Sequence, residues 1–205
     1  MRCYGENRVY QDYADDPPDP ASDLNIDPDG YCERHWNSGY PYLRGKDAVV
    51  GHLWIRKYDR IEADVRATVL REPLSRALSQ YYYWTSVPRS PHPVHRYILD
   101  NRLNFLSFLR LPTVRWIYSR IFFRGVDMKR FDYIIDYARL ERDWGTITSC
   151  LGIVTEPPQQ HLNETTSLVD DYLSKTQKFM GEPKKVAIAR GLLADDMRFY
   201  ERYAR

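Results

Sequence analysis

Two arginines and two serines stand where an apolar stretch gives way to a helical pattern. Residues 69–84 read VLREPLSRALSQYYYW, with Arg71 directly after the apolar run and Arg76 and Ser79 further along. A guanidinium group can hold a phosphate through two hydrogen bonds, and a hydroxyl group can add a third. These residue types at this spacing favour a site for one compact dianion. The alternative is structural, with Arg71 paired to a carboxylate and Ser79 solvated on a helix.

The elements around this stretch determine where its polar residues lie. Residues 65–70, VRATVL, alternate in polarity and are rich in β-branched side chains, which predicts a strand. Pro73 suits the first turn of a helix, because its missing N–H would have no partner there. Leu74 and Leu78 then follow at helical spacing. Ligands of open α/β sheets bind beyond the carboxyl ends of strands, where Arg71 is expected to lie.

Strands alternate with helical patterns over the rest of the chain. We expect irregular structure over 11–42, strands at 46–55 and 131–136, loops at 87–95 and 155–167, and helices over 96–110, 114–123, 140–151, 168–179 and 184–203. This alternation predicts an α/β class with a mainly parallel sheet.

Length and composition are those of an ordinary globular protein. The 205 residues are 43% hydrophobic and 28% charged, which predicts one domain, with an irregular acidic arm over 1–45 and a core over 46–205. Two arginines and eight carboxylates fall within residues 1–30, so the remainder is basic. A net charge of +2 argues against nucleic acid as a partner, whereas a basic body can attract a small polyanion.

Cysteine spacing and hydropathy bear on the compartment. Cys3, Cys32 and Cys150 are odd in number and widely separated, which favours a reducing compartment. No apolar run approaches the length of a membrane span, so we expect no span in this chain. A cytoplasmic location is favoured, and the alternative is the Golgi lumen if an N-terminal anchor has been removed.

Two stretches imitate metal sites. Residues 23–30, DLNIDPDG, space acidic groups like a calcium loop, but Pro28 interrupts the loop and Trp36 stands where a bidentate glutamate is needed. His92 and His95 lie in a proline-rich loop without a nearby cluster of ligands. We therefore predict no metal site.

Residues 69–84 resemble the 3′-phosphate-binding motif of the sulfotransferases that use 3′-phosphoadenosine 5′-phosphosulfate. The matching positions are Arg71, Glu72, Pro73, Arg76, Ser79 and Tyr81. The pattern is most similar to the carbohydrate sulfotransferases, including the heparan 2-O-type enzymes and their bacterial relatives. The resemblance implies a P-loop-NTPase-like sulfotransferase fold, a mainly parallel sheet flanked by helices.

Further stretches extend the resemblance over about residues 46–205. VVGHLWIRKY at 49–58 is similar to a Gly-His segment whose histidine acts as general base, which implies a catalytic role for His52. Arg71, Ser79 and Arg76 would bind the nucleotide donor, whose product is 3′,5′-ADP. The acceptor would be a hydroxyl group of a carbohydrate-type molecule. Weaker similarity lies at 131–153, 161–166 and 195–204. The alternative for His52 is a structural histidine at a strand end.

The sequence also departs from the family pattern. It contains no Lys-x-Gly-Gly/Ala-Thr-Ser loop, whose backbone amides would hold the 5′-phosphosulfate, and the strand before that loop is also expected to be missing. Val50 and Ala138 replace a histidine and a glutamate that relatives carry. Either the chain is truncated or the loop has been lost. The alternative function is an inactive domain that binds nucleotide or glycan.

Overall fold

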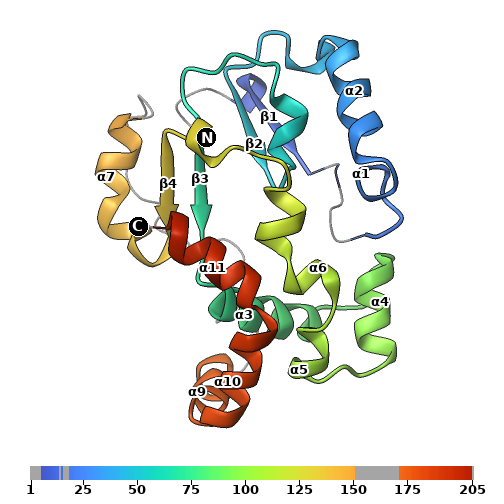
Figure 1. Cartoon of the computed structure of the whole chain (residues 1–205), viewed down its shortest axis with the longest axis vertical. Coiled ribbons are helices and arrows are strands. Elements are labelled where there is room, and N and C mark those ends of the chain that lie inside the picture. Colours follow the sequence, from blue (N-terminus) through green and yellow to red (C-terminus); the bar gives the residue numbers. More distant parts are fainter. Residues whose placement is uncertain (1–5, 14, 16–18, 151–170, 205) are drawn as a thin grey trace. The chain divides into compact units, whose positions relative to one another are not determined.

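The computed structural model describes residues 6–13, 15, 19–150 and 171–204, which fall into two compact units. The first unit contains the described residues of 6–69 and 118–150, and the second contains those of 70–117 and 171–204. The described part is a mixed α/β structure, mostly helical, with two separate two-stranded parallel sheets (Figure 1). The predicted α/β class is confirmed, but the described strands form two small sheets rather than one larger one.

The first sheet joins β1 (Val9–Asp12) to β2 (Ala48–Gly51). The strands are parallel, with Val9 opposite Ala48 and Asp12 opposite Gly51. A Cβ atom placed on Gly51 would lie 1.8 Å from the carbonyl oxygen of Asp12. Only glycine therefore allows the two backbones to approach this closely at the end of the sheet.

Replacing Gly51 with alanine is expected to destabilise the protein by about 1–3 kcal/mol, because the added methyl group must push β1 away from β2. Urea unfolding followed by far-UV circular dichroism measures the change in the free energy of unfolding. Gly145→Ala is the matched control, since a Cβ there meets no atom and alanine favours the surrounding helix. A Gly51→Ala protein as stable as the wild type would contradict this account of the sheet.

The second sheet joins β3 (Ala67–Leu70) to β4 (Tyr133–Asp136), which run side by side in Figure 1. Both strands were predicted from the sequence. Each stops after four residues because a helix start follows: the side chain of Glu72 caps the helix after β3, and that of Asp136 accepts the N–H of Ala138 at 3.0 Å.

The chain around the two sheets forms helical elements: η1 Glu6–Arg8, α1 Asp23–Ile26, α2 Pro28–Ser38, η2 Pro41–Leu43, η3 Ile55–Tyr58, the π-helix η4 Ile117–Phe122, η5 Met128–Arg130, η6 Tyr137–Arg139 and α7 Leu140–Cys150.

The prediction of irregular structure over 11–42 is wrong for its central part. Asp27 accepts the N–H of Gly30 at 3.1 Å as the N-cap of α2, and Pro28 occupies the first helical position. Gly39 ends the helix with φ at 66°, a left-handed conformation that glycine adopts without strain. The stretch that imitates a calcium loop thus forms the short helix α1, the N-cap Asp27 and the start of α2.

A buried ionic cluster ties β1 to η3. The side chain of Lys57 is 2% exposed, and its Nζ lies 2.5 Å from Oδ2 of Asp12 and donates to Oδ1 of Asp15. The hydroxyl of Tyr58 donates to Asp12 at 2.5 Å, and that of Tyr31 donates to Asp15. Burial raises the pKa of both tyrosines, and these hydrogen bonds raise it further. Both hydroxyl groups therefore keep their protons and act as donors. An apolar cluster of Leu24, Cys32 and Trp54, with Tyr31 and Trp36 against it, completes this core.

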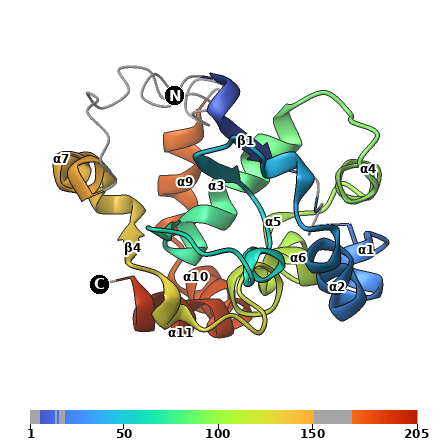
Figure 2. The ribbon, with the colours of Figure 1, turned by 90° about the horizontal axis from the view of Figure 1, so that it is seen from above.

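The second unit is helical. Its elements are α3 Pro73–Ser86, α4 Pro93–Asp100, α5 Phe105–Phe108, α6 Pro112–Arg115, α9 Tyr172–Met180, α10 Pro183–Leu192 and α11 Ala194–Tyr203. The central helix is α3, which contacts α4, α5 and α11 (Figure 2). Its buried residues are Leu74, Ala77 and Leu78, which pack with Ile98, Phe108, Leu109, Val114, Ala189 and Leu193. The spacing of the apolar residues in α3 was read correctly from the sequence.

Three predicted helices are interrupted. The helix expected over 96–110 divides into α4 and α5, because Arg102 has φ at 44° and Asn104 caps α5 by accepting the N–H of Ser107 at 2.9 Å. The helix expected over 184–203 divides into α10 and α11 at Leu193, which is fully buried. The pattern at 114–123 divides between α6 and η4. The predicted loop at 155–167 lies outside the described residues.

Candidate functional site

Arg71 lies between β3 and the first turn of α3. It follows Leu70, which is fully buried, and its own side chain is half-buried. Its Nε donates to Oγ of Ser75 at 3.2 Å. This bond holds the guanidinium group against the first turn of α3. Sequence reasoning counted Ser75 but assigned it no role, although its spacing of four residues from both Arg71 and Ser79 could have revealed one.

Glu72 has a structural role at the start of the helix. One carboxylate oxygen accepts the N–H of Ser75 at 2.6 Å, while Oε1 lies 3.9 Å from Nη2 of Arg190 on α10. Pro73 occupies the first helical position, as predicted. The free N–H groups at a helix start carry a partial positive charge. The carboxylate of Glu72 therefore takes up part of this charge and also lies near Arg190, while Arg71 adds a further cation at the junction.

Ser79 lies one turn after Ser75 on the same face of α3, because residues four apart are neighbours on a helix surface. Its side chain is half-buried. Arg71 bonds to Ser75, so Arg71, Ser75 and Ser79 share one side of the helix. These three residues supply one guanidinium and two hydroxyl groups, which can donate several hydrogen bonds to a single phosphate.

Arg76 holds two helices together. Its Nη1 donates to Oε1 of Gln80 at 2.8 Å, and its Nη2 donates to the carbonyl oxygen of Val114 on α6 at 2.8 Å. Tyr81, another residue of the predicted motif, donates its hydroxyl to the carbonyl of Leu103 at 3.0 Å, and burial raises its pKa. Arg76 and Tyr81 therefore hold α3 to neighbouring segments of the same unit.

His52 lies in the first unit, directly after β2, whereas Arg71, Arg76 and Ser79 belong to the second unit. Its side chain is exposed. The ring meets Tyr13 edge-on, with centroids 5.6 Å apart, and lies 6.5 Å from the ring of Phe122. These aromatic neighbours orient the imidazole and leave it accessible to another molecule.

The other histidines singled out from the sequence have structural contacts. His92 caps α4 by accepting the N–H groups of Val94 and His95. His95 is buried, and its Nε2 lies 2.7 Å from the carbonyl oxygen of Trp84. Residues 161–166, which carry part of the family resemblance, lie outside the described residues.

No family model, curated protein or solved structure matches this chain. Among the helices of the described residues, none combines the length and the apolar character that crossing a membrane requires.

Proposed function

We propose that this chain is a sulfotransferase-type domain that binds 3′-phosphoadenosine 5′-phosphosulfate and transfers its sulfuryl group to a carbohydrate hydroxyl. The observation that carries the proposal is the strand–Arg71–helix junction, where the guanidinium group already contacts a serine on the face of α3 that also bears Ser79. The proposed architecture is the P-loop-NTPase-like sulfotransferase fold. The arrangement of Arg71, Glu72 and Pro73 around the helix start supports it.

In this proposal, the residues of the second unit bind the nucleotide. Arg71 and Ser79 hold the 3′-phosphate, since both can donate hydrogen bonds to its oxygens. Arg76 keeps α3 in place through Val114 and can add positive charge nearby. A phosphate so held positions the rest of the nucleotide, and positioning supplies much of the rate enhancement in group transfer between oxygen atoms.

His52 is the proposed general base. The imidazole accepts the proton of the acceptor hydroxyl as the oxygen attacks the sulfur atom, the bond from sulfur to the bridging oxygen breaks, and 3′,5′-ADP leaves. Imidazole suits this role because its ordinary pKa lies close to neutral pH.

A second candidate function is binding without transfer. It is favoured by the lack of any Lys-x-Gly-Gly/Ala-Thr-Ser stretch in the sequence, because that loop would hold the 5′-phosphosulfate. Such a domain would bind nucleotide through Arg71 and would release no sulfated product. Transfer of radiolabelled sulfate from the donor to a panel of carbohydrate acceptors separates the two functions.

Binding of 3′,5′-ADP tests the nucleotide site. At about 100 times its dissociation constant, the ligand is expected to stabilise the wild-type protein by about 2.7 kcal/mol, seen as a rise in melting temperature. Arg71→Ala is expected to abolish the rise, because it removes the charged fork that binds the phosphate.

The matched control for this titration is Arg110→Ala, which removes an exposed arginine of the same unit. It should leave the shift unchanged, and Arg71→Lys should restore only part of it, since lysine keeps the charge and loses the planar fork. An equal shift in wild-type and Arg71→Ala proteins would rule out this site.

A further inference from the structure

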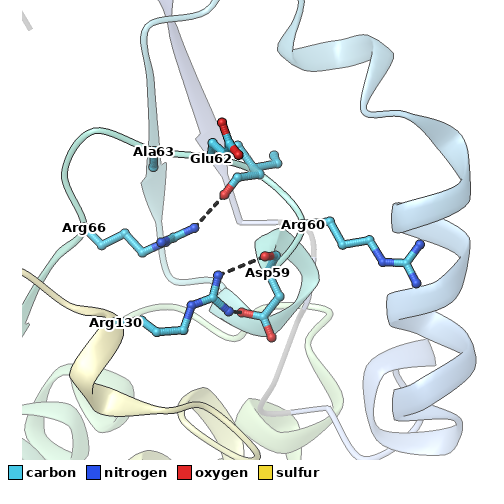
Figure 3. A pocket seen from close by; sticks show the side chains of 7 residues that line it. Asp59, Arg60, Glu62, Ala63, Arg66 and Arg130 are labelled. Carbon is cyan, nitrogen blue, oxygen red and sulfur yellow. Dashed lines mark hydrogen bonds and ion pairs between the residues drawn. The ribbon is translucent and has the colours of Figure 1, made fainter.

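A cavity of about 380 Å³, broadly open to solvent, lies in the first unit, between the turn that precedes β3 and η5 (Figure 3). Its charged lining residues are Asp59, Arg60, Glu62, Arg66 and Arg130, three cations against two carboxylates. Cavities of this size lie within the range that holds small organic ligands. The lining is therefore suited to a small molecule that carries negative charge.

Arg130 is fixed in the wall of the cavity. Its Nη1 lies 2.5 Å from Oδ1 of Asp59, and its Nη2 donates to the main-chain oxygen of the same residue at 2.9 Å. This pairing neutralises the Asp59 carboxylate and holds the guanidinium plane in one orientation. A guanidinium group has five N–H donors, so donors remain after these two bonds.

Arg66 faces the same space, and its guanidinium group bonds to a main-chain oxygen. Its Nη2 donates to the carbonyl oxygen of Ile61 at 2.6 Å, while its backbone N–H donates to Asp132 at 2.7 Å. Within the described part of the chain, no carboxylate pairs with its half-buried guanidinium group. Figure 3 shows the guanidinium groups of Arg66 and Arg130 both directed into the space between their two segments. Two oriented cations with unused donors thus converge on one cavity.

The remaining charged residues contribute less to the cavity. Arg60 lies over the ring of Trp36, with its guanidinium carbon 4.5 Å from the ring centroid, and Figure 3 shows it pointing away from Arg66 and Arg130. Glu62 is exposed, so water screens its charge. The cations that face the cavity are therefore Arg66 and Arg130, and the carboxylates of the lining are Asp59, paired with Arg130, and the exposed Glu62.

We propose that this cavity binds a small organic oxyanion, a phosphate or sulfate monoester, with the anionic group held between Arg66 and Arg130. Guanidinium groups hold such anions by paired hydrogen bonds. The volume leaves room for an organic group beside the anion. This inference does not rest on the proposed function, because every residue that carries it lies in the first unit, whereas Arg71 lies in the second.

The experiment is a calorimetric titration at low ionic strength, performed on the Arg71→Ala chain so that the proposed nucleotide site contributes nothing. The probes are glycerol 3-phosphate and inorganic phosphate. We expect saturable binding of the ester at one site and weaker binding of inorganic phosphate. Adding Arg66→Ala should lower the affinity at least about tenfold, since it removes charge-assisted hydrogen bonds. Lys129→Ala, which removes an exposed cation beside Arg130, should leave the affinity within about twofold.

Asp59→Asn provides a test of opposite sign. It removes a negative charge from the lining and keeps the main-chain oxygen of residue 59 that accepts from Arg130, so it should tighten ester binding several-fold. Circular dichroism confirms that each variant is folded. Three results would overturn the proposal: no saturable binding, equal affinity for ester and inorganic phosphate, or the same loss of affinity in Lys129→Ala as in Arg66→Ala. Because Arg71 is already absent, each result stands whether or not the proposed function holds.

Discussion

Replacement of Lys57 by methionine is expected to destabilise the protein by about 3–5 kcal/mol. The ammonium group is 2% exposed and lies between the carboxylates of Asp12 and Asp15, which are equally buried. Without it, two negative charges remain close together and out of water, and the hydroxyls of Tyr58 and Tyr31 cannot compensate for both. Urea unfolding at neutral pH measures the loss.

The control for this substitution is Lys129→Met, which removes an exposed lysine of the same unit and should change stability by at most about 0.5 kcal/mol. Adding Asp15→Asn to Lys57→Met should recover part of the loss, because one uncompensated charge disappears. Equal stability of Lys57→Met and Lys129→Met would show that the cluster contributes little to the fold.

Replacement of His52 by alanine is expected to lower kcat for sulfuryl transfer by about 10²–10⁴, since it removes the proposed general base. The affinity for 3′,5′-ADP should stay at the wild-type value, because the proposed nucleotide contacts come from Arg71 and Ser79. The exposed side chain contributes little to packing, so the variant should fold normally. Steady-state kinetics and a 3′,5′-ADP titration measure the two quantities.

The matched control is His92→Asn, which also removes an imidazole and keeps a side-chain acceptor at the N-cap of α4. It should leave both kcat and nucleotide affinity unchanged. If the His52→Ala protein transfers the sulfuryl group at the wild-type rate, His52 is not the general base. If transfer and nucleotide affinity fall together, His52 acts in binding rather than in proton transfer.

The sequence determined the junction between β3 and α3. Its signals are local: β-branched alternation before Leu70, a proline that suits the first helical turn, and apolar residues at helical spacing from Leu74 to Leu78. The placement of Arg71 and Ser79 at this junction follows from the same signals. Their hydrogen-bond capacity is also a property of residue type. That capacity is what makes the candidate site recognisable in the sequence.

Other features depended on contacts between distant residues. β1 is a strand because Val9–Asp12 pairs with Ala48–Gly51, and this close approach needs a glycine nearly forty residues away. The start of α2 resembled a loop because Asp27 and Pro28 favour turns as well as helix starts, and burial of Cys32 in the core decides between them.

Among the charged residues, too, some features follow from the sequence and others only from the tertiary structure. Lys57, Arg66 and Arg130 look like ordinary solvated cations in the sequence. Tertiary structure decided that Lys57 is buried between two carboxylates while Arg66 and Arg130 face a cavity, because those partners come from segments tens of residues apart. The sequence by itself therefore determined the junction of β3 and α3 and the hydrogen-bonding groups that the Arg71 motif carries. Burial and charge pairing, which set the energetic role of each ionic group, came only from the fold.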